Sequence, residues 1–301
     1  MMSRAGSAFA AQQRTPSVAK DEIVLLGTRG GPLVGGYNDS PSANLLLYKG
    51  VPYVIDAGYG ITFKLIEAGV DLPALRYVFI THHHSDHNLE LGPLLYNSWA
   101  AGLRMSVDVY GPAGLNDLLA GYWTSNRYDL ETRIADEGRP DLRKLVLGHE
   151  YSSGQILSTD AVKVSALRNL HPPVTESYAL KFELGGKTIV FSGDTAFFPP
   201  LAEFAKGADY LIHEVLYGPA VDALVARRPN AQTLKASILS HHTLAEDVGR
   251  IATQASVKTL VLNHFVPGDD RTLTPQVWSD AVAKTFRGKI VVGSNMLRLP
   301  L

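Results

Sequence analysis

The chain has 301 residues, of which 46% are hydrophobic and 19% are charged, as in an ordinary folded enzyme. It contains no cysteine, which excludes disulfide bonds and thiolate metal ligands. The net charge of −1 gives no overall attraction for nucleic acid, and no apolar run is long enough to span a membrane. We therefore expect one domain over residues 21–301, and the sequence leaves a homodimer open.

Residues 1–20 are rich in Ala, Ser and Gln and show no strand or helix period, which predicts a flexible tail. Ala8-Phe9-Ala10 resembles the cleavage site of a secretory signal, but no apolar segment precedes it. Either the similarity is a coincidence or the sequence begins inside a longer precursor. The expected location is cytoplasmic as the sequence is written, and periplasmic or secreted if an upstream signal peptide has been lost.

Short apolar stretches between turns predict the strands of the first half, and helical spacing predicts two helices among them. The expected strands are 23–26, 44–48, 52–55, 77–80 and 107–110, and the expected helices are 61–68 and 89–102. Residues 124–143 are strongly charged and lack a clear period. We expect them to lie over or beside the active-site cleft as a lid.

The second half repeats this style, with expected strands at 161–167, 178–184, 188–191, 210–213, 259–262, 289–292 and 296–299. Gly185-Gly186 predicts a hairpin turn. Thr243-Leu244-Ala245-Glu246 fits a capping box that opens a helix running to about residue 255. Strands dominate both halves, which predicts an α/β or α+β fold with two sheets.

Four side chains of metal-binding type lie within six positions directly after the 77–80 strand, namely His82, His84, Asp86 and His87. Imidazole nitrogen and carboxylate oxygen are ligands that zinc accepts. A loop that leaves a strand can present alternate side chains to one point, so His82 and His84 are placed for one ion and Asp86 and His87 for a second. The alternative is a plain solvated loop, against which the density of ligand-type residues argues.

The pattern His82-x-His84-x-Asp86-His87 resembles the signature of the metallo-β-lactamase superfamily. Three further residues match that family in the right order: His171 before two prolines, Asp194 after a strand, and His264 at the end of the 259–262 strand. The resemblance covers residues from about 22 to 299 and implies a four-layer αββα sandwich. It implies that His82, His84 and His171 hold one metal ion, that Asp86, His87 and His264 hold a second, and that Asp194 bridges the two.

Within this superfamily the chain is most similar to the ribonuclease Z-like branch. The signals are His213-Glu214 after a strand, His242 just before a helix, and Leu262-Asn263-His264-Phe265. The long arm with which ribonuclease Z grips tRNA is not evident, and no segment rich in Lys and Arg replaces it. The cysteine ligand of class B1 and B2 lactamases is also missing.

The resemblance implies a zinc-dependent hydrolase with two divalent ions, Mn²⁺ and iron being the other candidates, and with a metal-bridging hydroxide as the nucleophile. Expected substrates are a small ester, lactone, β-lactam or phosphoester; the alternative is a phosphodiesterase or endoribonuclease of the ribonuclease Z type. An iron-dependent oxidase and a non-enzymatic binding module are further alternatives, and the complete ligand set argues against the binding module.

We expect Asp86, His242 and Glu214 to take part in catalysis. His242 precedes the expected capping-box helix, whose free N–H groups favour negative charge. It is therefore placed to stabilise an oxyanion or to protonate the leaving group, and Glu214 is placed to orient it. The other histidines near these motifs, His83, His149 and His241, are expected to be structural or exposed. The Gly30-Gly31-Pro32 segment lacks a phosphate-loop pattern and predicts a plain turn.

Overall fold

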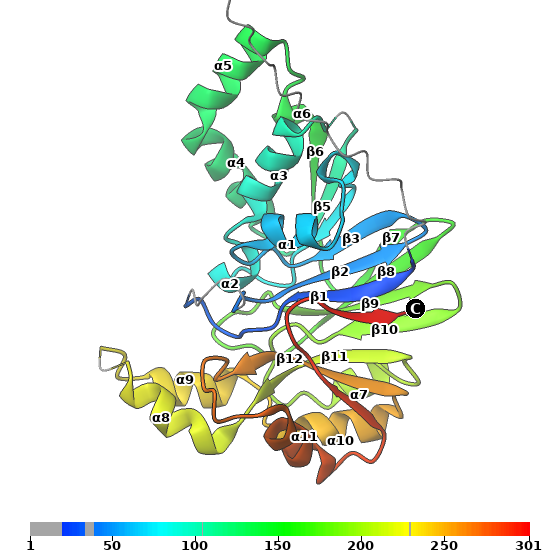
Figure 1. The fold of residues 1–301 in the computed structure, drawn as a ribbon, viewed down its shortest axis with the longest axis vertical. Coiled ribbons are helices and arrows are strands. Elements are labelled where there is room, and N and C mark those ends of the chain that lie inside the picture. The colour runs from blue at the N-terminus through cyan, green and yellow to red at the C-terminus, as the bar shows by residue number, and fades with distance from the viewer. Residues whose placement is uncertain (1–19, 34–38, 104, 229) are drawn as a thin grey trace, which may run out of the picture.

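The computed structural model of the protein is described here over residues 20–33, 39–103, 105–228 and 230–301. The expected N-terminal tail falls outside these ranges except for Lys20. Two seven-stranded β-sheets pack face to face, and helices cover the outer face of each (Figure 1). This arrangement is the four-layer αββα sandwich that the sequence implies.

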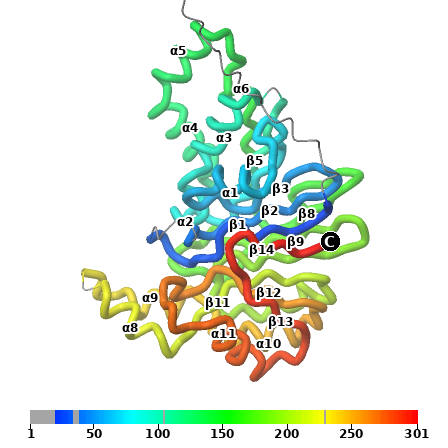
Figure 2. Tube along the Cα trace, in the orientation of Figure 1, coloured from blue at the N-terminus to red at the C-terminus, as the bar shows by residue number. Residues whose placement is uncertain are grey.

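The first sheet has the strand order β14-β1-β2-β3-β4-β5-β6. From β14 to β3 neighbouring strands are antiparallel, and from β3 to β6 they are parallel. Its strands are β1 Glu22–Gly27, β2 Ala43–Tyr48, β3 Val51–Ile55, β4 Tyr77–Phe79, β5 Val107–Gly111, β6 Val146–Glu150 and β14 Leu297–Pro300. Figure 2 shows the C-terminal strand lying beside the first strand of the chain.

The second sheet repeats this plan with the order β13-β12-β11-β10-β9-β8-β7, antiparallel from β7 to β10 and parallel from β10 to β13. Its strands are β7 Gly154–Ser158, β8 Val162–Arg168, β9 Tyr178–Leu184, β10 Lys187–Phe191, β11 Tyr210–Leu216, β12 Thr259–Val266 and β13 Lys289–Val292. Parallel strands end together at one edge of a sheet, so the loops that follow β4, β10 and β12 are brought to a common region.

Helices from separate parts of the chain cover the two sheets. On the first sheet they are α1 Ile61–Glu67, α3 Leu91–Ala100, α4 Leu115–Ser125, α5 Arg127–Glu137, α6 Leu142–Leu145 and the 3₁₀ turn η1 Leu72–Ala74. On the second sheet they are α7 Pro200–Phe204, α10 Ala245–Ala255 and α11 Pro275–Ala283. Three further helices and a 3₁₀ turn lie near the metal-binding motif or beside β11, namely α2 Ser85–Asn88, α8 Val221–Ala226, α9 Leu234–His241 and η2 Gly218–Ala220. Among the described residues, no helix combines the length and the apolar character needed to cross a bilayer.

Alternation along the strands builds the core between the sheets. On β9, Tyr178, Leu180 and Phe182 point to this central layer, whereas Ala179 packs on the helical side with α7 and α10 residues. Phe79 of the first sheet meets Phe182 of the second edge-on, with ring centroids 5.2 Å apart. Period-two burial on both sheets therefore produces one inter-sheet core and two sheet–helix cores.

The lid predicted over residues 124–143 is wrong. These residues include α5 and α6, and they pack against α3, where Trp99 Nε1 donates to the Pro140 carbonyl at 2.7 Å and the Arg139 guanidinium lies over the Trp99 ring. Figure 1 shows α4 and α5 at one end of the molecule and α8 and α9 at the other. The charges of α5 pair along the helix, as Arg133 does with Asp129 and Glu137, so the segment needs no cleft to accommodate them.

Candidate metal centre

The motif residues lie where β4 ends and α2 begins. His82 and His84 occupy the extended stretch after β4, and the single turn of α2 carries Asp86 and His87. The other three predicted ligands come from the second sheet: His171 from the loop after β8, Asp194 from the loop after β10, and His264 from β12. The structure thus brings all seven residues to the common edge of the two sheets.

A bulge in β12 aims His264 at the site. The pairing with β11 shifts between Asn263 and Phe265, which leaves His264 as the extra residue with a φ of 43°. A non-glycine residue rarely adopts this left-handed conformation, and bulges commonly redirect a side chain beside a functional site. The last ligand position therefore depends on a local departure from regular strand geometry.

The first group of potential ligands consists of His82, His84, His171 and Asp194. The Nδ1 atom of His84 lies 3.1 Å from Nε2 of His82 and 3.1 Å from Nε2 of His171. Ligand atoms of a tetrahedral zinc ion, each bonded at about 2.0–2.1 Å, are roughly 3.4 Å apart. One ring nitrogen carries one proton or one lone pair, so hydrogen bonding cannot satisfy all three nitrogens together. A cation bound by all three nitrogens satisfies them together.

The second group consists of Asp86, His87, His264 and again Asp194. Nε2 of His87 lies 3.3 Å from Asp194 Oδ1, and Nε2 of His264 lies 3.1 Å from Asp194 Oδ2. The Asp86 carboxylate is 3.6 Å from His87 Nε2 and 3.4 Å from His264 Nε2. Nε2 of His87 is buried without a hydrogen-bond partner among the described atoms, which is the state expected of a ligand atom directed at an ion.

Burial and neighbouring charges shift the pKa values of the predicted ligands in different directions. Burial lowers the pKa of His82 well below its usual range and that of His171 to about 4, so both rings are neutral and offer lone pairs. Burial alone would raise the pKa of Asp194, but the imidazoles of His264 and His87 hold it well below its usual value. The neutral imidazoles of His82 and His171 and the ionised carboxylate of Asp194 fit a divalent ion. Burial alone would lower the pKa of His87, but the carboxylates of Asp194 and Asp56 raise it well above its usual value, so an ion at Nε2 would displace a proton there.

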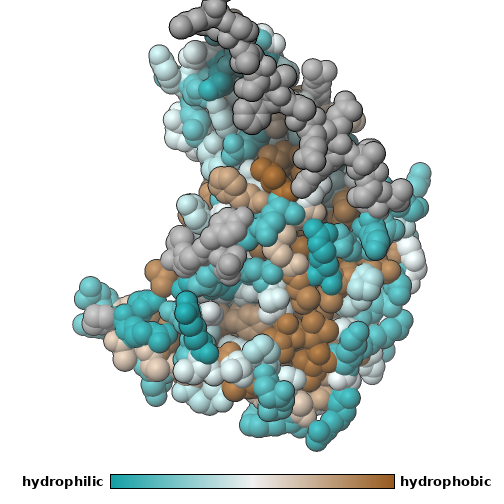
Figure 3. Space-filling view, viewed as in Figure 1, coloured by the Kyte–Doolittle hydropathy of each residue, from teal (hydrophilic) through white to brown (hydrophobic). Residues whose placement is uncertain are grey.

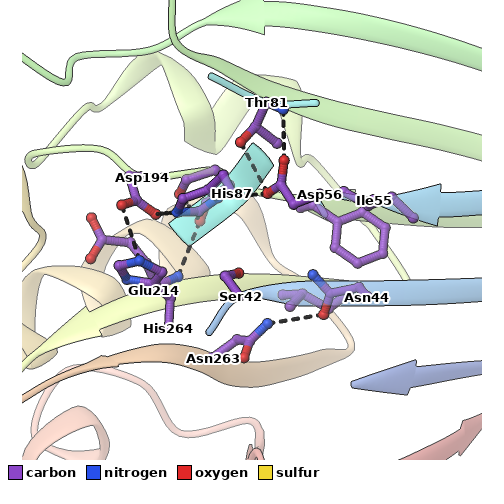
Figure 4. Close-up of a pocket in the computed structure, with 14 residues that line it drawn as sticks. Ser42, Asn44, Ile55, Asp56, Thr81, His87, Asp194, Glu214, Asn263 and His264 are labelled. Carbon is purple, nitrogen blue, oxygen red and sulfur yellow. Dashed lines mark hydrogen bonds and ion pairs between the residues drawn. The ribbon is translucent and has the colours of Figure 1, made fainter. Parts of the chain in front are cut away.

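Asp56, which the sequence analysis did not single out, fixes the orientation of His87. Its Oδ2 atom accepts a hydrogen bond from His87 Nδ1 at 2.8 Å, and both its oxygens accept from Thr81 (Figure 4). This contact holds the proton of His87 on Nδ1 and leaves Nε2 directed at the site. Asp56 directly follows the β3 strand, and a carboxylate at the end of a buried strand is the signal that could have found it.

Similar contacts orient the first group. Nδ1 of His171 donates to the backbone carbonyl of His241 at 3.0 Å, and Nδ1 of His82 lies 3.1 Å from the Thr81 hydroxyl. In both rings Nε2 is left free to bind a cation. The end of α9 and the end of β4 therefore support two ligands from opposite sheets.

His242 and Glu214 form a buried pair beside both groups. Nδ1 of His242 lies 2.9 Å from Glu214 Oε2, and Glu214 Oε1 accepts from the Thr195 backbone N–H at 2.9 Å. Burial alone would lower the pKa of His242, but the Glu214 carboxylate raises it to about 9. The ring centroid of His242 is 5.7 Å from that of His171 and 5.5 Å from that of His264. The Glu214 carboxylate thus favours the protonated form of His242, whose ring lies beside both ligand groups.

The capping box predicted at Thr243 is wrong. The N-cap of α10 is Leu244, without a side-chain cap, and the Thr243 hydroxyl donates to the Thr195 carbonyl at 2.6 Å. His242 is the residue that ends α9. Its position is therefore set by Glu214 and by the end of α9 rather than by the N–H groups of a following helix.

Three further histidines lie around the site or away from it, and His149, expected in a surface loop, belongs to the strand β6. His83 points away from the ligands, with Nε2 3.3 Å from the Pro112 carbonyl, and the half-exposed His149 pairs with Asp108. The His241 ring contacts the Ser237 hydroxyl and also packs edge-on against the ring of the predicted ligand His171, with ring centroids 5.4 Å apart.

The glycine-rich segment after β1 is more than the plain turn that the sequence predicts. The N–H of Gly31 donates to Asp86 Oδ2 at 2.9 Å, and Gly30 packs so closely on His264 that a Cβ atom there would lie 2.8 Å from its ring. A side chain at position 30 would push against a predicted ligand. The sequence also predicts a turn at Gly35-Gly36, which lies outside the described residues.

A cavity of about 420 Å³ opens onto both ligand groups. His84, Asp86, His171, Asp194, His242 and His264 contribute to its lining. Small-molecule sites usually have volumes of roughly 300–1,000 Å³. The ligand groups therefore face a space that is large enough for a substrate.

Comparisons with known proteins agree with this geometry. A family model described as the Anti-Pycsar protein Apyc1 matches residues 22–238. Ribonuclease Z of Mycobacterium bovis (strain BCG / Pasteur 1173P2) is 30% identical over 281 residues, covering 92% of this chain and 97% of that protein. Among solved structures, the metallo-β-lactamase fold protein YhfI of Bacillus subtilis and the short form of human tRNase Z both have a TM-score of 0.67. They are 18% and 19% identical, respectively, and both alignments cover 92% of this chain and 98% of the other.

The fold, the two ligand groups and these similarities define a metal-dependent hydrolase of the metallo-β-lactamase fold. The chain belongs to the ribonuclease Z-like branch of that superfamily and to the family that the Apyc1 model describes.

Proposed function

We propose that the protein is a phosphodiesterase that uses two divalent metal ions, preferably zinc, to hydrolyse a small phosphodiester. One observation carries the proposal: two buried ligand groups share Asp194 and face a cavity that His242 also lines. Ribonuclease Z and tRNase Z act, by their names, on RNA, which is a phosphodiester. Among the esters, lactones, β-lactams and phosphoesters that the sequence leaves open, the relatives therefore support the phosphoester.

In the proposed reaction, the oxygen of a water molecule bonds to phosphorus, one phosphorus–oxygen ester bond breaks, and the departing oxygen takes up a proton. When bound, the metal ions activate this water and polarise a phosphoryl oxygen. His82, His84 and His171 would hold one ion, Asp86, His87 and His264 the other, and Asp194 both.

His242 supplies the proton to the departing oxygen in this proposal. Its pKa of about 9 keeps it protonated at neutral pH, and its ring lies beside both ligand groups. Glu214 stabilises the charged ring and fixes its direction, because it is itself held by the Thr195 backbone. This arrangement supports general acid catalysis.

The proposal is tested by assaying zinc-loaded protein on bis(4-nitrophenyl) phosphate, 4-nitrophenyl phosphate, 4-nitrophenyl acetate and a chromogenic cephalosporin. We expect the diester to be the preferred substrate, and we expect about two equivalents of metal per chain. Preferred turnover of the acetate or the cephalosporin would overturn the proposed substrate class. Full activity in protein free of metal would overturn the metal-dependent mechanism.

An endoribonuclease of the ribonuclease Z type is the second candidate, favoured by 30% identity along 92% of the chain. Against it, the projecting helix α5 has the sequence RYDLETRIADE, in which four acidic residues outnumber two arginines. Such a helix repels phosphates rather than attracting them. Binding of precursor tRNA should therefore be weak at physiological salt, and tight binding with cleavage at its 3′ side would promote this candidate.

A further inference from the structure

The cavity at the metal centre has an apolar wall that the proposed chemistry does not use. One face of α9 contributes Leu234, Ser237, Ile238 and His241, which are spaced three and four positions apart as one side of a helix requires. Leu224 of α8 lies in the same lining. The metal-binding face of the cavity is thus continuous with a surface rich in leucine and isoleucine.

The helices α8 and α9 share a small core with the ends of β11 and β12. Leu216, Val221, Ile238 and Val266 make this core, and Leu224 and Leu234 pack on its edge. In the space-filling view the pair stands out from the body of the molecule as a lobe (Figure 3). Leu234 is only partly buried against this core and also lines the cavity, so its side chain can contact a bound molecule.

The charged side chains near this wall form ion pairs with one another. Asp269 receives the guanidinium groups of Arg227 at 3.1 Å and Arg228 at 3.6 Å, and Arg29 pairs with Asp39 at 2.5 Å. Arg29 also lies 3.9 Å from Asp269. These three guanidinium groups share two carboxylates, so the ion pairs do not select against an anion, and any selection by the wall comes from its apolar side chains.

The wall and the proton donor are joined directly along the chain. His242 is the residue that follows α9, and the carbonyl of His241 accepts the hydrogen bond of His171 at 3.0 Å. A group seated against Leu234 therefore contacts the helix that positions both His242 and a predicted ligand. Contacts made far from the reacting atoms can in this way contribute to the rate.

We propose that this wall is a specificity subsite that selects phosphodiesters whose non-leaving substituent is apolar or aromatic. The inference rests on the proposed function and narrows its substrate class. Leu234 and Ile238 are the residues that select, and the metal-binding face holds the phosphate. A substrate with only a small alkyl group there would leave the wall uncovered.

The test compares methyl 4-nitrophenyl phosphate with phenyl 4-nitrophenyl phosphate, which release the same leaving group. Zinc-loaded wild-type protein should prefer the phenyl diester. Leu234→Ala should lower kcat/KM for the phenyl diester by roughly 10-fold and leave the methyl diester nearly unchanged, as expected when apolar contact is removed from a pocket. Leu234→Phe, which fills the space, should reverse the preference.

Leu239→Ala is the matched control, because Leu239 lies on the same helix but is 45% exposed and does not line the cavity. It should behave as wild type on both diesters. Equal losses on both diesters in Leu234→Ala, with Leu234→Phe also showing no change of preference, would overturn the subsite.

Binding measurements distinguish a failure of the subsite from a failure of the proposed function. By calorimetry, phenylphosphonate should bind the zinc-loaded protein more tightly than methylphosphonate, and Leu234→Ala should remove that difference. If neither diester is hydrolysed but the difference in binding is present, the proposed function fails and the subsite stands. If diesters are hydrolysed and the two phosphonates bind equally, the subsite fails alone.

Discussion

The proton needed by the departing oxygen has a specific source in the proposed mechanism. His242 is held by Glu214 at 2.9 Å and belongs to neither of the two groups that share Asp194. We expect His242→Ala to lower kcat by roughly 10²–10³, as when one group that stabilises a transition state is lost. KM should change little, since the interaction develops with the charge.

Metal content distinguishes this role from ligation. His242→Ala should retain about two equivalents of metal, and the loss should shrink for diesters with very good leaving groups. His149→Ala is the control, because His149 is half-exposed and pairs with Asp108. Loss of one ion from the His242 variant would make His242 a ligand instead of a proton donor.

Asp56 acts through His87 and is expected to control metal affinity. Its carboxylate accepts from His87 Nδ1 at 2.8 Å. In Asp56→Asn an amide N–H₂ can take the place of one accepting oxygen, so the His87 ring loses its fixed proton and direction. Zinc affinity, measured by competition with a chromophoric chelator, should fall roughly 10- to 100-fold. Asp108→Asn, which alters the His149 pair, should bind zinc as wild type does.

The seven predicted ligands could be named from the sequence because their residue types and order match a specific motif, whereas the residues that orient them could not. Asp56 and Thr195 act through hydrogen bonds between segments far apart in the chain. The capping box was wrongly predicted at Thr243 for the same reason. The Thr243 hydroxyl donates to the Thr195 carbonyl in another loop, and no local sequence pattern predicts that hydrogen bond.

Among the helices and strands, the strands in which successive side chains alternate strictly between the two faces were predicted best. The expected strand 178–184 coincides with β9, whose apolar residues alternate between two cores. β12 extends to Val266, beyond the predicted end at Leu262, because Asn263 and His264 interrupt the apolar run while still pairing with or bulging from β11. The helices α8 and α9 were missed, since each is short and packs only a few apolar residues into a local core.

The helix α5 provides a prediction at this scale. It packs on α3 and α4 and contributes no residue to the cavity lining. Replacing the exposed acidic residues Glu131 and Asp136 with glutamine and asparagine should leave kcat/KM for a small diester unchanged. The same change should strengthen binding to RNA at low salt, because it removes repulsion between the helix and phosphates. Gel-shift titration over a salt series and the diester assay check the two outcomes; a change in diester specificity would reinstate a role at the active site.

At the scale of the whole molecule, the two-sheet class followed from periodicity, but the four-layer arrangement followed only from the resemblance. Strand patterns show which faces are buried, and they do not show which sheet covers which. Phe79 and Phe182, for example, read as separate core positions in the sequence and meet only when the sheets pack.

The stability of the fold should depend on pH through His213, which is buried on β11 and whose Nδ1 contacts the Glu214 carbonyl at 2.7 Å. Burial lowers the pKa of His213 to about 4 from 6.5. Below about pH 6.5 His213 takes up a proton in the unfolded chain but remains neutral in the folded chain. The stability that neutral His213 allows is therefore fully present above pH 6.5. It is lost as the pH falls toward 4, by up to roughly 3 kcal/mol in the free energy of unfolding.

Urea unfolding of metal-free wild-type protein and His213→Gln at pH 7, 5.5 and 4.5 measures this contribution. The difference in free energy of unfolding should move in favour of the variant as the pH falls, because glutamine does not titrate. A difference that stays constant over this range would mean that His213 does not remain neutral in the fold.

The pairing of β1 with β14 has a consequence for how the molecule is made. Along the chain, β1 precedes the other strands of its sheet, whereas β14, the partner of its outer edge, follows them all. A chain that folds as it is synthesised therefore exposes that edge until β14 is made, and an exposed edge is a template for pairing with another copy. His264 also follows the other six predicted ligands, so completion of the second ligand group and closure of the first sheet both come late in synthesis.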